Sequence, residues 1–303
     1  MVSFGYVGSR GYHLLRHREA DHFIPTILPD GTRFYPAGAP KINPNFNSIR
    51  MATTDVNSYY NGLYAGVLRR FQGGLQFQAS YTLSKSTDNN SGAWGTDIRN
   101  QESFVEDPLD ANADYALSGF DARHVVTFNF TYDIPVAARF TGFTRNVLDG
   151  WQINGITTLS SGQPFTVVWS GNRGRTYPGS TRSRPNLRAG ANGNPVLGGP
   201  DLYFDPTVFE PQPAGFTGNA PRNSIIGPGL ANTDFSLVKS INFGEGRLLQ
   251  FRSEVFNIFN RANFGIPLRV LFDTQGKRIA SAGQIKNTIT PSRQVQFGLK
   301  LTF

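Results

Sequence analysis

The sequence contains no cysteine, few charged residues and no long apolar run. The lack of cysteine excludes disulfide scaffolds, thiolate catalysis and thiolate-bound zinc or iron–sulfur centres. Charged residues make up only 17% of the 303 residues, whereas about 25% is usual for soluble domains. No stretch of about 18 apolar residues occurs, so a transmembrane helix is excluded. Helical periodicity is also nearly absent, which disfavours helical enzymes and coiled coils.

Aromatic residues are abundant, at 13% of the chain, and the net charge is +8. The basic residues are scattered singly, apart from Arg69 and Arg70, and form no basic helix or dense patch. Nucleic-acid binding needs clustered positive charge. We therefore expect no nucleic-acid partner.

The strongest pattern is an alternation of apolar and polar residues. It is clearest at the C-terminus, where apolar residues occupy every second position: Val295, Phe297, Leu299, Leu301 and Phe303. The same alternation runs through 75–83, 126–132 and most of 234–243, with Lys239 as an exception. Such a period of two is typical of antiparallel strands with one apolar and one polar face.

Eight strands are predicted from this pattern. Their ranges are 1–9, 57–71, 74–87, 123–134, 149–169, 232–243, 246–260 and 292–303. The connections alternate in length: 10–56, 88–122, 170–231 and 261–291 are long, whereas 72–73, 135–148 and 244–245 are short or shorter. One end of the sheet therefore carries all the long loops.

This segregation of loop lengths favours an antiparallel transmembrane up-and-down β-barrel segment, all-β in class. Outer-membrane barrels combine short periplasmic turns with long extracellular loops, and their strands need about 9–11 residues to cross the bilayer. The alternative is a soluble β-barrel or sandwich, which would have loops of mixed length and more charge on its outward faces. The polar faces here are mostly uncharged Gln, Asn, Ser and Thr.

Several segments resemble the C-terminal part of TonB-dependent receptors, specifically the Oar-like group that carries an N-terminal carboxypeptidase-regulatory-like domain. The stretches that carry the resemblance run from end to end of the chain: 5–14 (GYVGSRGYHL), 60–63 (YNGL), 74–86 (GLQFQASYTLSKS), 121–125 (DARHV), 150–155 (GWQING), 161–165 (SGQPF), 250–264 (QFRSEVFNIFNRANF) and 296–303 (QFGLKLTF).

The resemblance implies that residues 1–303 supply about eight strands of a 22-strand barrel. The signal peptide, TonB-contacting box and plug domain of the family have no counterpart in these residues, so we expect the C-terminal portion of a longer receptor. Its function would be energised uptake or export of a large substrate, such as an iron chelate, glycan, peptide or protein. The partners would be outer-membrane lipid, lipopolysaccharide, an unknown extracellular substrate, and TonB through the N-terminal plug region. The alternative is a surface adhesion protein anchored by its barrel.

The C-terminal strand also resembles the assembly signal that the bacterial barrel-assembly machinery reads. The residues concerned are Phe297, Leu299, Leu301 and Phe303. We expect an integral outer-membrane location, with the loops extracellular and the C-terminus periplasmic.

Four further groups of residues are candidates for interactions. The loop 170–231 carries five arginines whose guanidinium groups suit phosphates of lipopolysaccharide or an anionic ligand: Arg173, Arg175, Arg182, Arg184 and Arg188. A mobile, solvated loop is nevertheless the preferred interpretation, because glycine and proline occur throughout the segment. Trp151, Trp169 and Tyr132 lie near predicted strand ends, as the aromatic girdles of a barrel would. The alternative is that they are ordinary core aromatics.

The other two groups concern metals. The loop 88–121 is rich in carboxylates, but their spacing does not match a calcium-binding loop, so a solvated loop is preferred: Asp88, Asp97, Glu102, Glu106, Asp107, Asp110, Asp114 and Asp121. His13 and His17 would share a face only on a helix, and no HExxH pattern is present. We expect neither a metal nor another cofactor. No nucleophile elbow or other catalytic set occurs, so we do not expect an enzyme.

Overall fold

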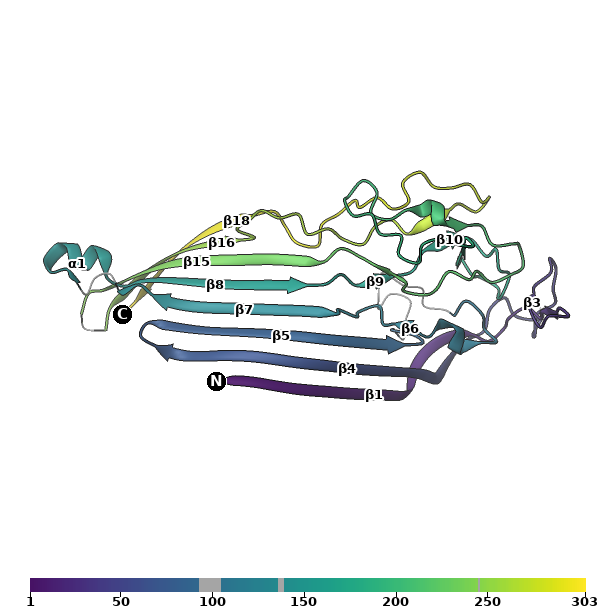
Figure 1. The fold of residues 1–303 in the computed structure, drawn as a ribbon, viewed down its shortest axis with the longest axis horizontal. Helices are drawn as coiled ribbons and strands as arrows, with labels where there is room; N and C mark the ends of the chain where they lie inside the picture. Colours follow the sequence, from purple (N-terminus) through teal and green to yellow (C-terminus); the bar gives the residue numbers. More distant parts are fainter. Residues whose placement is uncertain (93–104, 136–138, 245) are drawn as a thin grey trace.

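Eight long strands form one sheet in a computed structural model that describes residues 1–92, 105–135, 139–244 and 246–303. Each long strand lies antiparallel beside the next long strand along the chain (Figure 1). In order across the sheet they are β1 (Val2–Glu19), β4 (Arg50–Gln72), β5 (Leu75–Asp88), β7 (His124–Asp133), β8 (Trp151–Ser160), β15 (Leu230–Asn242), β16 (Leu248–Phe256) and β18 (Gln294–Thr302). The expected all-β, antiparallel, up-and-down architecture is confirmed.

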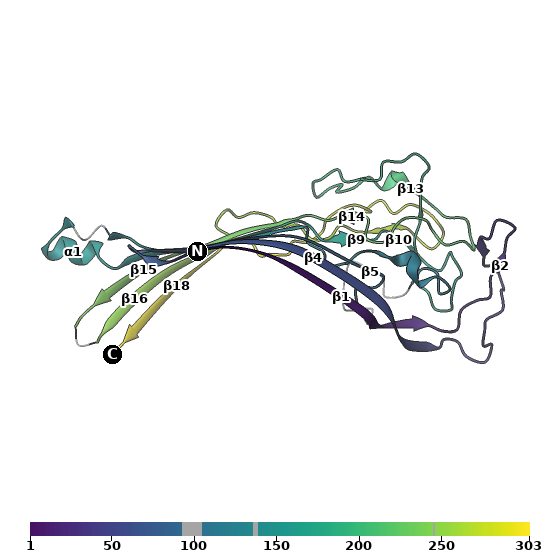
Figure 2. The same cartoon turned by 60° about the horizontal axis from the view of Figure 1, so that its bottom comes forward.

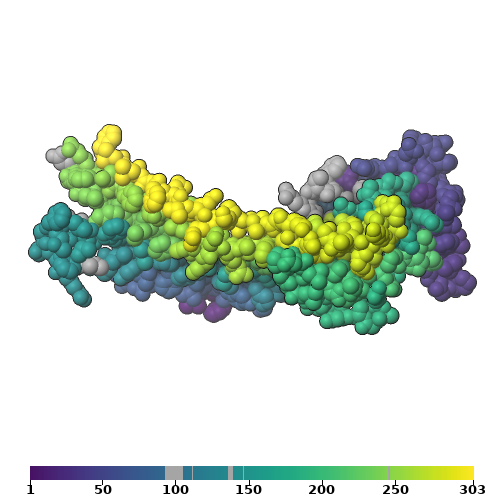
Figure 3. All heavy atoms as spheres, turned by 90° about the horizontal axis from the view of Figure 1, so that it is seen from above, coloured from purple at the N-terminus to yellow at the C-terminus, as the bar shows by residue number. Residues whose placement is uncertain are grey.

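The sheet is open within the residues that the structure describes. Its outer strands, β1 and β18, each pair on one side only. Figure 3 views the molecule from the β18 side, where the C-terminal residues (yellow) run along the face toward the viewer. Figure 2 shows that the sheet is curved. No closed barrel forms in this part of the chain, so the total strand number stays a prediction.

Long and short connections lie at opposite ends of the sheet, as the sequence predicts. The long ones are 20–49, 89–123, 161–229 and 257–293, and the short ones are 73–74, 134–150 and 243–247. Gly73 and Gly74 make the tightest turn with φ of 61° and 78°, a conformation that glycine adopts without steric cost. Both chain termini lie toward the short-turn end (Figure 1).

The first two long strands extend well past their predicted ends. β1 continues to Glu19 rather than residue 9, and β4 begins at Arg50 rather than residue 57. They remain paired through Glu19 and Arg50, with register shifts around Gly11 and Leu14. The alternation does not predict this extension because two strands can pair through their backbones without an apolar face, as they do here beyond the alternating segments.

The predicted strand 149–169 is wrong: β8 ends at Ser160. The backbone of Gly162 lies so close to Gly227 that a Cβ atom would stand 1.7 Å from the Gly227 carbonyl oxygen. Pro164 follows, and proline cannot donate to a ladder. The alternation nevertheless continues through Phe165, Val167 and Trp169, because these residues face a second, separate core.

That second core belongs to a structure that we call the loop cap, formed by the four long connections. Its regular elements are short: β2 (Thr26–Ile27), β3 (Arg33–Phe34), β9 (Pro164–Phe165), β10 (Val168–Ser170), β11 (Arg182–Ser183), β12 (Asn186–Leu187), β13 (Phe209–Glu210), β14 (Ile225–Ile226), β17 (Val270–Phe272) and the 3₁₀ turns Ala111–Asp114 and Pro206–Val208. A further short strand of the same connections, β6 (Ala116–Leu117), pairs with the end of β5 and so adds to the main sheet. Trp169 stacks on Phe272 with ring centroids 5.0 Å apart. Phe165 packs on Phe204 at 5.6 Å.

The distribution of buried residues is the reverse of that in a soluble sheet protein. Among the described residues, every buried apolar side chain lies in the loop cap, except Val56 on β4 and Val238 on β15. The sheet instead exposes its large apolar side chains. At the short-turn end, the connection between β7 and β8 contains the α-helix α1 (Gly142–Leu148). None of the helices in the described residues is long and apolar enough to span a membrane.

Candidate functional site

One face of the sheet, which we call the apolar face, is continuous across all eight long strands. Residues directly opposite one another in an antiparallel pair lie on the same face. The strand registers therefore place together Val2, Phe4, Tyr6, Leu63, Val67, Leu75, Phe77, Tyr81, Val126, Phe128, Phe130, Tyr132, Ile153, Leu159, Phe235, Leu237, Ile241, Leu249, Phe251, Val255, Val295, Phe297, Leu299 and Leu301. Phe4 is 81% exposed and Leu299 is 72% exposed. Contiguous apolar exposure on this scale indicates an interaction with lipid or another apolar surface.

The opposite face, the polar face, is lined mostly by uncharged side chains that bond between strands. Thr131 Oγ1 donates to Asn154 Oδ1 at 2.8 Å. Gln152 Nε2 donates to Asp133 Oδ1 at 2.7 Å. Gln296 and Glu254 are cross-strand partners on this face. A polar face of this kind suits a wet interior.

The apolar face ends in aromatic and cationic residues at the short-turn end. Trp151 and Lys239 are cross-strand partners there. The Lys239 ammonium lies 5.4 Å from the Trp151 ring centroid, and Tyr132 lies near the end of β7 on the same face. Trp151 and Tyr132 thus stand where an interfacial girdle would be, and their contact with lipid stays a prediction.

Trp169 does not belong to this girdle, contrary to the sequence prediction. It lies on β10 in the loop cap and is only 1% exposed. At the long-loop end, Tyr59 takes the corresponding position on β4. Its ring packs edge-on against Tyr12 at 6.0 Å and Tyr115 at 6.2 Å, and Arg10 lies over it at 5.9 Å.

The C-terminal strand presents the predicted assembly residues. Phe297 and Leu301 lie with Leu299 on the apolar face of β18, at an edge of the sheet. Phe303 follows the strand and is 94% exposed. This placement leaves them accessible to another protein, and their role in assembly stays a prediction.

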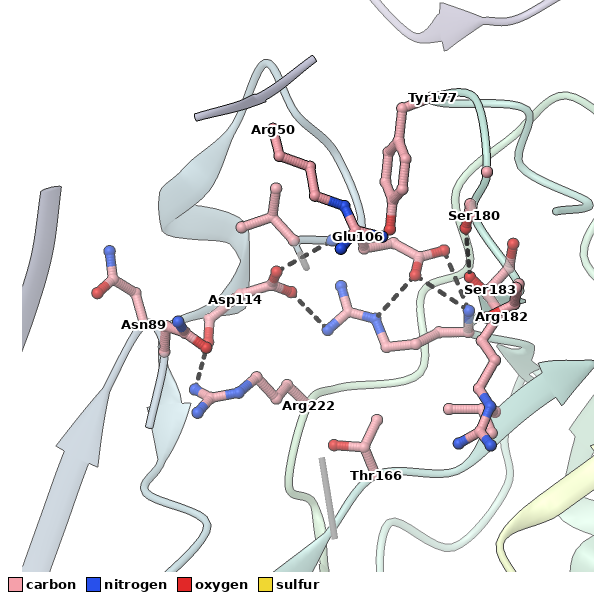
Figure 4. A pocket seen from close by; sticks show the side chains of 16 residues that line it. Arg50, Asn89, Glu106, Asp114, Thr166, Tyr177, Ser180, Arg182, Ser183 and Arg222 are labelled. Atoms are coloured by element: carbon pink, nitrogen blue, oxygen red, sulfur yellow. Dashed lines mark hydrogen bonds and ion pairs between the residues drawn. The ribbon is translucent and has the colours of Figure 1, made fainter. Parts of the chain in front are cut away.

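A polar cavity of about 220 Å³ lies in the loop cap, next to the end of β5 (Figure 4). Its walls carry two carboxylates and several hydroxyl groups. The cationic residues of its lining are Arg50, Arg182, Arg184 and Arg222. Positive groups outnumber negative ones, so the residue composition of the cavity resembles that of an anion-binding site. Its arginines, however, form bonds with other groups of the protein.

Arg222 is the most heavily bonded of these arginines. Its Nη2 donates to Asp88 Oδ1 at 2.6 Å and to Ser91 Oγ at 2.7 Å. Its Nη1 donates to the backbone oxygens of Asp88 and Asp114 at 2.8 and 2.9 Å. The side chains of Arg222 and Asp88 are 7% and 2% exposed. One buried guanidinium therefore joins the end of β5 to two of the long connections.

Arg184 makes a second junction between the same two connections. Its Nη1 lies 2.7 Å from Asp114 Oδ1, and its backbone N–H donates to both carboxylate oxygens of Glu106 at 3.1 Å. Burial raises the pKa of Glu106 to about 7, a rise that the Arg184 charge opposes and the Asp114 charge reinforces. The Glu106 carboxyl therefore titrates near neutral pH.

The five arginines predicted to contact an anionic ligand divide into two groups. Arg173 and Arg184 support the cap: Arg173 lies 4.7 Å from the Trp169 ring centroid and donates to the Gln212 carbonyl. Arg182 and Arg188 are exposed, and Arg188 is 3.6 Å from Glu210, while Arg175 is partly exposed with φ of 52°. The loop that carries them is packed on its own core, so the expectation of a solvated loop is wrong.

Most of the described carboxylates of the acidic loop are buried or partly buried, whereas Asp110 is exposed. The carboxylates of this loop neutralise arginines or accept backbone N–H groups. Arg33 pairs with Asp107 at 2.7 Å, and Ser86 N–H donates to Asp121 Oδ1 at 2.6 Å. Asp97 and Glu102 lie outside the described residues. In the described part of the chain, no group of three or more His, Asp or Glu residues is arranged to hold a metal ion.

The histidine pair is not on a helix. His13 and His17 lie on β1, where His13 has φ of 56°. Its Nδ1 is 3.2 Å from the Thr54 carbonyl oxygen. The i, i+4 spacing therefore places no shared metal ligands here.

Sequence reasoning did not find the Arg222–Asp88 junction. The two residues are 134 positions apart, and neither position carries a local signal of pairing. The arrangement as a whole joins a two-faced sheet at one end to a loop cap that is held together by buried ion pairs.

The comparisons with known proteins agree with this geometry. Residues 1–296 match the family model described as an outer membrane beta barrel domain. No curated protein matches the chain.

Proposed function

Because the chain belongs to the outer membrane beta barrel domain family, we propose that it is part of the wall of a TonB-dependent receptor of the Oar-like group. The family places the chain in the outer membrane as a barrel wall. The proposal adds that the barrel takes part in energised uptake or export of a large substrate. The chain would have no catalytic role.

The observation that carries the proposal is the two-faced open sheet. In hydrocarbon every backbone N–H and C=O needs a partner, so the outer edges of β1 and β18 must pair with further strands or with each other. Eight strands enclose only enough space for side chains. The loop cap has a core of its own and joins four long connections, which suits the mouth of a wider barrel.

The proposed orientation follows from the segregated connections. The loop cap would be extracellular and the short turns, with the C-terminus, would be periplasmic. In that position the cap would meet lipopolysaccharide and the substrate. The exposed cations Arg182 and Arg188 are the candidates for phosphate contacts among the predicted arginines.

The remaining partners are proposals of the same kind. The barrel-assembly machinery would read Phe297, Leu299, Leu301 and Phe303. TonB would act through an N-terminal plug region. Substrate identity is open among an iron chelate, a glycan, a peptide and a protein.

Transport is tested with labelled probes in cells that carry the whole receptor. A ferric chelate, an oligosaccharide, a peptide and a small protein, each fluorescent, are supplied to cells with and without TonB. Accumulation of one probe that stops without TonB supports the proposal. Surface binding of a probe with TonB-independent accumulation supports an anchor for adhesion instead.

Orientation is tested with cysteine, which the native chain lacks. A membrane-impermeant maleimide should label Asp201→Cys in intact cells, because Asp201 is exposed in the loop cap. Gln72→Cys, exposed at the short-turn end, should react only after the outer membrane is permeabilised. The opposite pattern would invert the proposed orientation.

A further inference from the structure

Helix α1 exposes apolar side chains at the short-turn end of the sheet. Phe143 is 82% exposed, Val147 is 48% exposed, and Phe140, just before the helix, is 42% exposed. A helix of this length is not stable by itself in water. Its apolar side chains therefore indicate a surface on which the helix rests.

The helix is amphipathic. Phe143 and Val147 are four residues apart and share one side. Arg145 is two residues from Phe143, or about 200° around the helix axis. An apolar side opposite a cation is the pattern of helices that lie in a membrane interface.

Two residues of the apolar face hold the C-terminal end of α1. Trp151 Nε1 donates to the Val147 carbonyl oxygen at 3.0 Å. Lys239 Nζ donates to the same oxygen at 3.0 Å and also to the Asp149 carbonyl. A cation is favourable at the carbonyl end of a helix. These bonds explain why a lysine interrupts the alternation of β15, and they place the end of α1 on the side of the sheet that faces lipid.

We propose that α1 is an interfacial helix that docks on the lipid leaflet at the short-turn end. Phe143 and Val147 insert at the boundary of the acyl chains. Arg139, which is exposed just before the helix, and Lys239 face lipid phosphates, whereas Arg145 lies on the opposite side of the helix and faces water. The inference rests on the proposed barrel wall, and continuity with the apolar face through Trp151 selects lipid rather than a protein as the occupant.

The experiment uses a single-cysteine reporter in the full receptor, reconstituted in vesicles of phosphatidylethanolamine and phosphatidylglycerol. An environment-sensitive fluorophore is attached at Phe143→Cys, and quenching by lipids with a nitroxide near the headgroup is compared with quenching by aqueous iodide. Arg145→Cys is the matched control on the opposite side of the same helix. Leu299→Cys is the reference for lipid contact, and Gln296→Cys is the reference for the polar face.

The expected result is severalfold stronger lipid quenching at position 143 than at position 145. Quenching at 299 without quenching at 143 overturns the docking of α1 and leaves the barrel wall intact. Absence of lipid quenching at 299 contradicts the barrel orientation itself. A reporter at 143 that neither lipid nor iodide quenches is covered by protein, which also overturns the inference.

Discussion

The sheet and the loop cap follow opposite rules of burial. The sheet presents apolar side chains outward, such as Phe297 at 68% exposure, whereas the cap encloses Phe165, Phe204 and Leu271 completely. The charged groups of the two parts differ too, since the cap buries ion pairs such as Arg184–Asp114. The cap is organised like a soluble domain and the sheet like a membrane wall. One chain therefore contains a part that is suited to lipid and a part that is suited to water.

The largest expected effect comes from removing the buried ion pair that joins the cap to the end of β5. Arg222→Ala leaves the Asp88 carboxylate buried without its cation, which typically costs about 3–5 kcal/mol. Hydrogen exchange should therefore rise in the cap connections 105–123 and 161–229 while the centres of β7 and β8 stay protected. Equal loss of protection in these strands would show that cap and sheet are a single cooperative unit.

A matched control comes from an exposed pair in the same cap. Arg188 and Glu210 are 53% and 47% exposed. Arg188→Ala should cost less than about 1 kcal/mol. A cost similar to that of Arg222→Ala would remove burial as the reason for the larger effect.

The next effect tests the lipid side of the sheet. Leu299→Arg should destabilise the barrel by about 2–4 kcal/mol if the position lies near the bilayer midplane. Urea unfolding in lipid vesicles measures this. Gln296→Arg lies on the polar face beside Glu254 and should be tolerated. Equal sensitivity at both positions would contradict the assignment of the two faces.

A smaller effect is a pH dependence confined to the cap. The pKa of Glu106, about 7, lies above the ordinary value of 4.5. The folded cap therefore binds this proton more tightly than the unfolded chain, so the contribution is full below about pH 4.5 and is lost as the pH rises through 7. We expect about 1–3 kcal/mol between these limits.

Glu106→Gln provides the control for this titration. The amide oxygen can still accept the Arg184 N–H, but the side chain no longer titrates. Thermal unfolding of the cap should then vary less between pH 4.5 and 8 than in the parent. An unchanged pH profile would assign the dependence to another group.

The smallest effect is spectroscopic. Nitroxide lipids should quench the fluorescence of Trp151 at the sheet rim but not that of Trp169 in the cap core. Trp151→Phe should therefore reduce lipid-quenchable emission, and Trp169→Phe should leave it unchanged. Loss of lipid quenching in Trp169→Phe but not in Trp151→Phe would contradict the placement of Trp169 in the cap core.

Much of the sheet could be predicted because alternation is a local property. The period-two pattern placed five of the eight long strands within four residues of their observed ends. It missed the extensions of β1 and β4, and the strand 149–169 was correct only as far as Ser160. The pair Gly73-Gly74 marked the tight turn. The candidate site was harder to predict from the sequence. Phe165 and Trp169 continue the alternation of a membrane strand, yet they pack in the core of the loop cap.

The alternation of apolar and polar residues is enough to assign the shared face and the long connections, because side-chain direction along a strand depends on position parity. The partners of the charged loop residues follow instead from the folded arrangement. Arg222 reaches Asp88 across 134 positions, and Lys239 reaches the end of α1 across 92. Such contacts depend on how distant segments pack, and no local pattern encodes them.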